Sequence, residues 1–100
     1  MKEFNENDII SLKLVSGEEV IGKFKSKTSD TTTIEKALVM MHGPQGLAFG
    51  TFFATANSEN GIDILNDKLM SIGLTNNKVK EEYARVTSSI AQAPKKTIIT

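Results

Sequence analysis

Few residues of this chain could carry out chemistry, and the first to consider is His42. It is the only histidine, and the chain has no cysteine, so one imidazole alone cannot hold a structural metal. His42 could act as the general base of a small hydrolase, but no serine or carboxylate is tied to it by a local motif. No glycine-rich phosphate loop follows a predicted strand. We therefore expect no enzymatic activity, metal or cofactor, and keep a hydrolase using His42 as the weakest alternative.

Charged side chains offer a second kind of chemistry, the binding of phosphates. Lys23, Lys25 and Lys27 alternate along one predicted strand and so share one of its faces. They could form a basic stripe for phosphates. Lysines also protect the solvated face of an edge strand from unwanted pairing, and we favour this second interpretation. Twelve basic and twelve acidic residues cancel, so nucleic-acid binding would need a local patch or repetition in an oligomer.

The 100 residues predict one domain, 1–100, which is large enough to bury a single core. No apolar run approaches the roughly 18 residues of a membrane span. The first residues lack the apolar segment of a secretory signal. Because disulfides are also excluded by the absence of cysteine, we expect a cytoplasmic protein that does not enter a membrane.

Hydrophobic periodicity predicts a β-hairpin at the start of the chain. Apolar and polar residues alternate over 9–15 and again over 18–27, which is typical of half-buried strands. Ser16-Gly17 interrupts the pattern where a tight turn needs a positive φ. Gly22 falls on the apolar side of the second strand, where a glycine usually marks a strong bend. Such a bend lets a small sheet curl into a barrel.

Further strands and a single helix follow. Further strands are expected at 34–41 and 47–56. Ile62 and Ile64 alternate again until Asn66-Asp67 breaks the run, and Leu69, Met70, Ile72 and Leu74 form the last strand. An apolar stripe predicts a helix at 76–92, formed by Val79, Tyr83, Val86 and Ile90 at spacings of four, three and four. Residues 93–100 form a tail. The predicted fold is mainly β, a small five-stranded open barrel over 9–74 with a C-terminal α-helix.

Two stretches resemble the motifs shared by Sm, LSm and Hfq proteins. The hairpin is similar to the first half of the first Sm motif through Leu12, Leu14, Gly17, Val20, Gly22 and Phe24. The stretch 64–69, followed by Ile72, keeps the apolar spacing of the second motif but has Leu65 and Asn66 where the family has arginine and glycine. The resemblance implies an SH3-like, Sm-like barrel. Common Sm proteins carry their helix before the barrel. A chain with its helix after the barrel resembles the divergent Sm-like proteins of bacteriophages and some prokaryotes.

The resemblance also implies a site for single-stranded RNA. In the family, the loop matching 26–33 holds the uracil site, and Asp30 is the counterpart of its aspartate. A role of Asp30 as a turn former is the equally weighted alternative. The stacking aromatic and the asparagine of that loop have no counterpart, and the missing arginine implies weak binding at best. The residues expected to contact RNA are Lys27, Ser29, Asp30, Thr32, Asn66 and Lys68.

Assembly is the third implication of the resemblance. In Sm-like proteins the fourth strand of one subunit pairs with the fifth strand of the next, which predicts a homo-oligomeric ring of five to seven subunits. The fourth strand here is apolar on both faces, as expected for a strand covered twice. The residues expected at the contact are Phe52, Phe53, Leu69 and Met70. The alternative is a structural or protein-interaction barrel without RNA binding, such as a phage assembly component, which an exposed apolar patch would favour.

Overall fold

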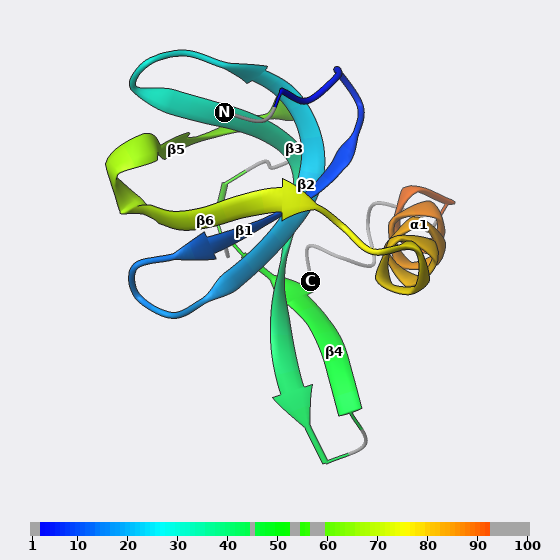
Figure 1. Cartoon of the computed structure of the whole chain (residues 1–100). Coiled ribbons are helices and arrows are strands. Elements are labelled where there is room, and N and C mark those ends of the chain that lie inside the picture. Colours follow the sequence, from blue (N-terminus) through cyan, green and yellow to red (C-terminus); the bar gives the residue numbers. More distant parts are fainter. Residues whose placement is uncertain (1–2, 45, 53–54, 57–59, 93–100) are drawn as a thin grey trace.

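The computed structural model describes residues 3–44, 46–52, 55–56 and 60–92, with the backbone alone for 89–92. An antiparallel β-sheet precedes a single C-terminal helix in this part of the chain (Figure 1). The elements are β1 (Ile9–Leu14), β2 (Glu19–Lys27), β3 (Thr31–Gly43), β4 (Gly46–Thr51), β5 (Ile62–Leu65), the 3₁₀ turn η2 (Asn66–Lys68), β6 (Leu69–Leu74) and α1 (Asn77–Gln92). The prediction of a mainly β fold with a C-terminal helix is confirmed.

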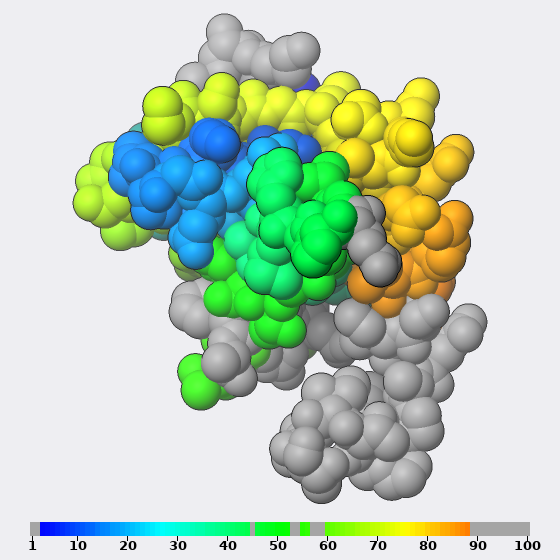
Figure 2. All heavy atoms as spheres, turned by 90° about the horizontal axis from the view of Figure 1, so that it is seen from below, coloured from blue at the N-terminus to red at the C-terminus, as the bar shows by residue number. Residues whose placement is uncertain are grey.

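The sheet has the strand order β4-β3-β2-β1-β6, and β5 pairs with β3 outside this path. The first part of β3 pairs with β5, from Thr31 opposite Leu65, and its last part pairs with β4, up to Gly43 opposite Gly46. The β3–β4 ribbon extends away from the rest of the sheet (Figure 1). In the view from below, the end of the ribbon points toward the viewer, with the β1–β2 hairpin on its left and α1 on its right (Figure 2). The sheet is therefore open, with β4 and β6 at its ends.

The strand count and several bounds differ from the prediction. Six strands are present in the described residues instead of five, because Ile62–Leu65 pairs with β3 whereas Leu69–Leu74 pairs with β1. The 3₁₀ turn η2 redirects the chain between these two partners. The third strand begins at Thr31 instead of 34, and the fourth ends at Thr51 instead of 56.

Gly22 lies at a bend of β2 and faces the core, as predicted. A Cβ at this position would lie 2.7 Å from Cδ1 and 3.1 Å from Cβ of the buried Ile34. The register between β2 and β3 shifts here, from Ile21 opposite Leu38 to Lys23 opposite Glu35. Lys36, in the bulge across from Gly22, has a φ of +54°. A glycine and a β-bulge therefore act together to turn the sheet.

Apolar side chains form two clusters. The main core joins β1, β2, β3 and β5 and consists of Ile10, Leu12, Leu14, Val20, Phe24, Ile34, Ala37, Ile62 and Ile64. A second cluster of Ile21, Leu38 and Tyr83 is flanked by Ile9, Met40, Phe49, Val79 and Val86. Ile9 and Ile21 alternate with the core residues along their strands, so α1 covers the opposite face of the sheet. Burial on both faces explains why several strands carry adjacent apolar residues.

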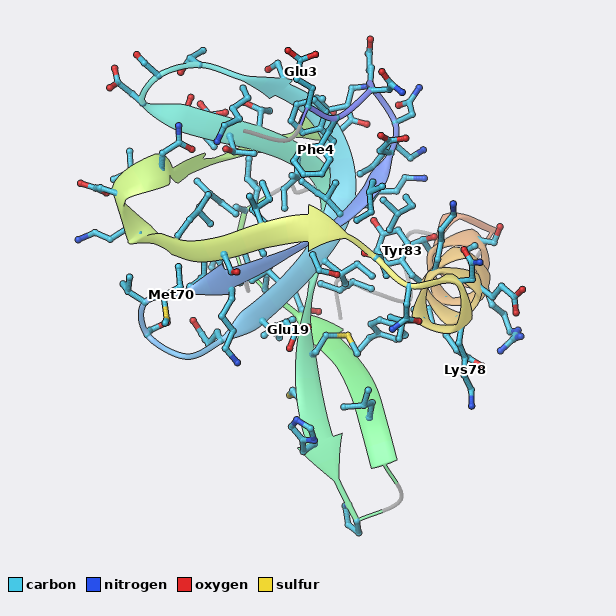
Figure 3. The ribbon with its side chains drawn as sticks, viewed as in Figure 1. Glu3, Phe4, Glu19, Met70, Lys78 and Tyr83 are labelled. Atoms are coloured by element: carbon cyan, nitrogen blue, oxygen red, sulfur yellow. The ribbon has the colours of Figure 1, made fainter. Side chains whose placement is uncertain are left out.

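The helix is capped and oriented by specific side chains. Asn76 Oδ1 accepts a 2.9 Å hydrogen bond from the amide of Val79, which satisfies one free donor of the first turn. Tyr83 points from α1 toward the sheet, whereas Lys78 points away from it (Figure 3). The apolar stripe of Val79, Tyr83 and Val86 is confirmed; Ile90 lies outside the described side chains.

Candidate nucleic-acid interface

The turn between β2 and β3 is built around the hydroxyl of Thr28. Its Oγ1 accepts hydrogen bonds from the amides of Asp30, at 3.1 Å, and Thr31, at 3.0 Å. The amide of Thr28 donates to the carbonyl of Thr31 at 2.8 Å. Threonine hydroxyls stabilise turns in this way because they substitute for a backbone acceptor. The turn is therefore fixed locally, with Ser29 and Asp30 exposed at its end.

The turn is also tied to η2, which lies far away in the sequence. Thr32 Oγ1 donates a 2.6 Å hydrogen bond to Asn66 Oδ1, across 34 positions of the chain. Asn66 Nδ2 donates to the carbonyl of Thr28 at 2.9 Å, and the Asn66 amide donates to the carbonyl of Asp30 at 2.8 Å. Three hydrogen bonds from one asparagine hold the two turns side by side. Thr32 is fully buried, so its hydroxyl depends on this partner.

The two turns and β6 border an open hollow of about 400 Å³. Its lining residues are Lys27, Thr28, Ser29, Asn66, Leu69, Met70, Ser71 and Ile72; we call this space the hollow. The lining residues from the two turns and the end of β2 are a lysine, a threonine, a serine and an asparagine, whereas those from β6 are three apolar residues and a serine. A volume of this size is in the range of small-molecule sites. The hollow can therefore accept a ligand that has one polar and one apolar side.

A β-bulge places Met70 in this lining. Lys13 lies opposite Ser71 and Leu14 lies opposite Leu69, so Met70 is the extra residue of β6 and has no partner on β1. Its side chain is 67% exposed, and Figure 3 shows it at the start of β6. Bulges redirect side chains and are frequent beside functional sites. The sequence carried a sign of this bulge, because Leu69 and Ile72 are three positions apart although both pack on the main core.

The residues predicted to bind RNA divide into three groups. Lys27, Ser29 and Asn66 line the hollow. Thr32 lies behind it, bonded to Asn66 and 3.5 Å from the Lys27 ammonium. Asp30 and Lys68 are exposed and do not line the hollow; the carbonyl of Lys68 accepts a hydrogen bond from the amide of Val15 instead. Sequence reasoning missed Thr28 and Ser71. A role of these residues in binding stays a prediction.

The residues predicted at a subunit contact are also dispersed. Phe52 and Leu69 are half-buried and pack against the main core of their own chain. Met70 is exposed and borders the hollow. Phe53 lies outside the described residues. The two predicted sets thus meet, because Leu69 and Met70 share the hollow with Lys27, Ser29 and Asn66.

The predicted lysine stripe has two separate roles in the fold. Lys25 lies 3.0 Å from a carboxylate oxygen of Glu6 and 3.8 Å from one of Glu35, and donates a 3.1 Å hydrogen bond to Asn7. The hydrogen bond to Glu6 raises the pKa of Lys25, with a smaller contribution from Glu35. Lys25 therefore fastens the N-terminal segment to β2, and Lys27 alone of the three lines the hollow.

His42 does not belong to the hollow. It is exposed on the β3–β4 ribbon, opposite Leu47. Within the described residues, no group of three or more histidine, aspartate or glutamate side chains is arranged to bind a metal. No helix in the same part of the chain has the length and hydrophobicity needed to cross a bilayer. No protein-family model matches the sequence, and a search of curated proteins finds no match.

Proposed function

We propose that this chain is an Sm-like barrel that assembles into a homo-oligomeric ring and binds single-stranded RNA in the hollow. The strand order β4-β3-β2-β1-β6, the bend at Gly22 and the 3₁₀ turn before the last strand support an SH3-like barrel. The motif similarity of the hairpin and of the stretch 64–69 supports the Sm-like assignment within that class. Fold alone does not define function, so the RNA proposal rests on the hollow.

The hydrogen bond between Thr32 and Asn66 is the observation that carries the proposal. It brings together the β2–β3 turn and η2, the two segments in which the Sm resemblance places RNA contacts. A part-buried, directional link between distant turns preorganises a surface, which reduces the cost of ordering it when a ligand binds. Lys27, Ser29 and Asn66 then offer one cation and several hydrogen-bonding groups on a common wall.

The chemistry of this wall suits one nucleotide of a single strand. The Lys27 ammonium would neutralise a phosphate, and the hydroxyls of Ser29 and Ser71 would bond phosphate or sugar oxygens. One cation per hollow predicts weak, salt-dependent binding. Leu65 provides no guanidinium fork for a phosphate where the family has arginine. Repetition of the hollow in a ring would raise the overall affinity, because linked weak sites bind one strand together.

The open edges of β4 and β6 support the proposed assembly. Each of these strands has a hydrogen-bonded neighbour on one side only within the described residues, and such edges pair readily with another chain. Pairing of β4 in one copy with β6 in the next is head-to-tail, and this contact closes into a ring when its rotation divides a full turn. We propose five to seven subunits, with Phe52, Phe53 and Leu69 at or beside the contact.

Binding to oligo-U and oligo-A at two salt concentrations, on a sample of known mass, tests this function. The expected result is weak binding by an assembled protein that decreases as salt increases. Binding of neither oligonucleotide at low salt would reject the RNA function. A monomeric mass would reject the ring.

A second candidate is a protein-interaction or structural barrel, which the β3–β4 ribbon favours. Met41 is 47% exposed and Leu47 is 56% exposed on opposite faces of this ribbon, and exposed apolar groups on a projecting element are typical of protein contacts. This candidate predicts that Leu47→Asp abolishes a protein interaction and leaves oligo-U binding unchanged. The leading proposal predicts oligo-U binding that depends on the hollow.

A further inference from the structure

Met70 is the extra residue of a β-bulge in β6, so its place in the strand does not follow from regular alternation. Neighbouring residues of a strand point to opposite faces, but Leu69, Met70, Ser71 and Ile72 all line the hollow. Four successive residues border the hollow because it lies along β6, and Met70 among them is skipped in the pairing with β1. Leu69 and Ile72 pack against the main core, and Met70 remains 67% exposed. The hollow is thus bordered by two apolar residues that pack on the main core and by Met70, whose apolar side chain is exposed.

We propose that Met70 is the base-contacting residue of the hollow, where its thioether packs against the face of a nucleobase. This inference rests on the proposed RNA function and states which residues of the hollow contact the base and which contact the phosphate. Methionine contacts aromatic rings favourably through its polarisable sulfur and adapts to rings of different size. Met70 would therefore supply the apolar contact that a stacking aromatic provides in other single-strand sites.

The polar residues Asn66 and Lys27 are proposed to contact the base edge and the phosphate of the same nucleotide. Asn66 has already committed one amide hydrogen to Thr28 and one Oδ1 lone pair to Thr32. One amide hydrogen and one lone pair remain, which is a donor beside an acceptor. A base edge with the complementary acceptor and donor, such as that of uracil, would match this pair. Lys27, at the other end of the hydrogen-bonded chain through Thr32, takes the phosphate.

The bulge also separates Met70 from the proposed subunit contact. A bulge interrupts the regular spacing of donors and acceptors along a strand edge, so another strand pairs poorly beside it. Met70 then stays available to a ligand while the remainder of the β6 edge joins the next subunit. Replacing Met70 should therefore change RNA binding and leave the mass of the assembly unchanged.

Fluorescence anisotropy with labelled oligo-U, combined with light scattering, tests this inference. Met70→Ala should weaken oligo-U binding roughly tenfold, as expected for one lost base contact. Met41→Ala is the matched control, because Met41 is also exposed but lies on the β3–β4 ribbon; its affinity should equal that of the wild type. Both variants should keep the wild-type mass.

Methionine oxidation gives a second readout that does not require a variant. Peroxide converts exposed methionine to the sulfoxide, and peptide mass spectrometry reports each position separately. Oligo-U should slow the oxidation of Met70 severalfold and leave Met41 unchanged.

The outcomes separate the two proposals. A wild type that binds no oligo-U rejects the RNA function together with this inference. A wild type that binds, with Met70→Ala binding equally well or Met70 unprotected, rejects this inference alone. A change of mass in Met70→Ala would make Met70 a subunit contact and would also reject it.

Discussion

The hydroxyl of Tyr83 donates a 2.7 Å hydrogen bond to the carbonyl of Lys36, the residue that bulges out of β3 with a φ of +54°. The ring of Tyr83 is buried between α1 and the sheet, edge-on to Phe49 at a centroid distance of 6.3 Å. A single side chain thus packs α1 on the sheet and donates to the carbonyl of the bulged residue Lys36. The bend that shapes the sheet and the helix that covers it are therefore stabilised together.

Stability at high pH should depend on Tyr83. Burial raises its pKa above the ordinary 10.0, and the charge of Glu35 adds to this effect. The unfolded chain loses the phenolic proton near pH 10 while the folded chain keeps it, so the free energy of unfolding falls as pH rises above that value. Tyr83→Phe should show a smaller fall.

This prediction can be checked by urea unfolding at a series of pH values around and above 10.0. Tyr83 is the only tyrosine, so tyrosinate absorbance reports its titration directly. The pKa of Lys25 is also raised, so Lys25 contributes to the pH dependence of stability in the same pH range. The variant Lys25→Met measures this contribution. Equal pH dependence of wild type and Tyr83→Phe would show that the buried phenol does not matter.

Gly22→Val should destabilise the fold by about 1–3 kcal/mol, because the new side chain would overpack the core against Ile34. The matched control is Gly73→Val on β6, since a Cβ there meets nothing within 4 Å. The control should change stability by no more than about 0.5 kcal/mol. Thermal unfolding of the three proteins decides this point, and equal melting temperatures would argue against the close approach of β2 and β3.

Asn66→Ala should cost about 1–3 kcal/mol, because the buried hydroxyl of Thr32 loses its acceptor. Asn66→Asp retains the acceptor for Thr32 and loses the donor to the carbonyl of Thr28. Its free energy of unfolding should therefore fall less than that of Asn66→Ala. Exposed Asn77 provides the control substitution to alanine. If Asn66→Ala unfolds at the same urea concentration as Asn77→Ala, the two turns are not held together by this side chain.

Assembly should be visible by light scattering as a mass of five to seven chains. Phe53→Asp is the best test of the proposed contact, because Phe52 packs on the main core and its replacement would also affect folding. We expect Phe53→Asp to lower the mass while circular dichroism stays unchanged. A monomeric wild type contradicts the ring, and an intact assembly in the variant contradicts the choice of contact.

Local sequence patterns predicted a strand or helix well where its periodicity alone determines which of its residues are buried. The alternation over 9–27 gave the hairpin, and the helical stripe gave Val79 and Tyr83 on one packed face. The inward position of Gly22 also followed from alternation.

Features that depend on distant partners were not predictable in this way. The partner of Ile62–Leu65 was one of these features, because this short segment pairs with β3 whereas Leu69–Leu74 pairs with β1. The bulge at Met70 and the positive φ of Lys36 arise from registers between strands far apart in sequence. The resemblance placed Thr32 and Asn66 in one site, but neither residue's sequence context indicated their hydrogen bond.

The central claim, that the hollow binds single-stranded RNA, is tested most directly by the salt dependence of oligo-U affinity in two matched variants. Lys27→Met removes the one cation that lines the hollow, and Lys78→Met removes an exposed cation on the far side of α1 (Figure 3). Both keep an unbranched side chain and change the net charge equally. We predict that Lys27→Met binds more weakly and with a shallower salt dependence than the wild type, whereas Lys78→Met matches the wild type. Equal affinities and equal salt dependence in all three proteins would contradict binding in the hollow.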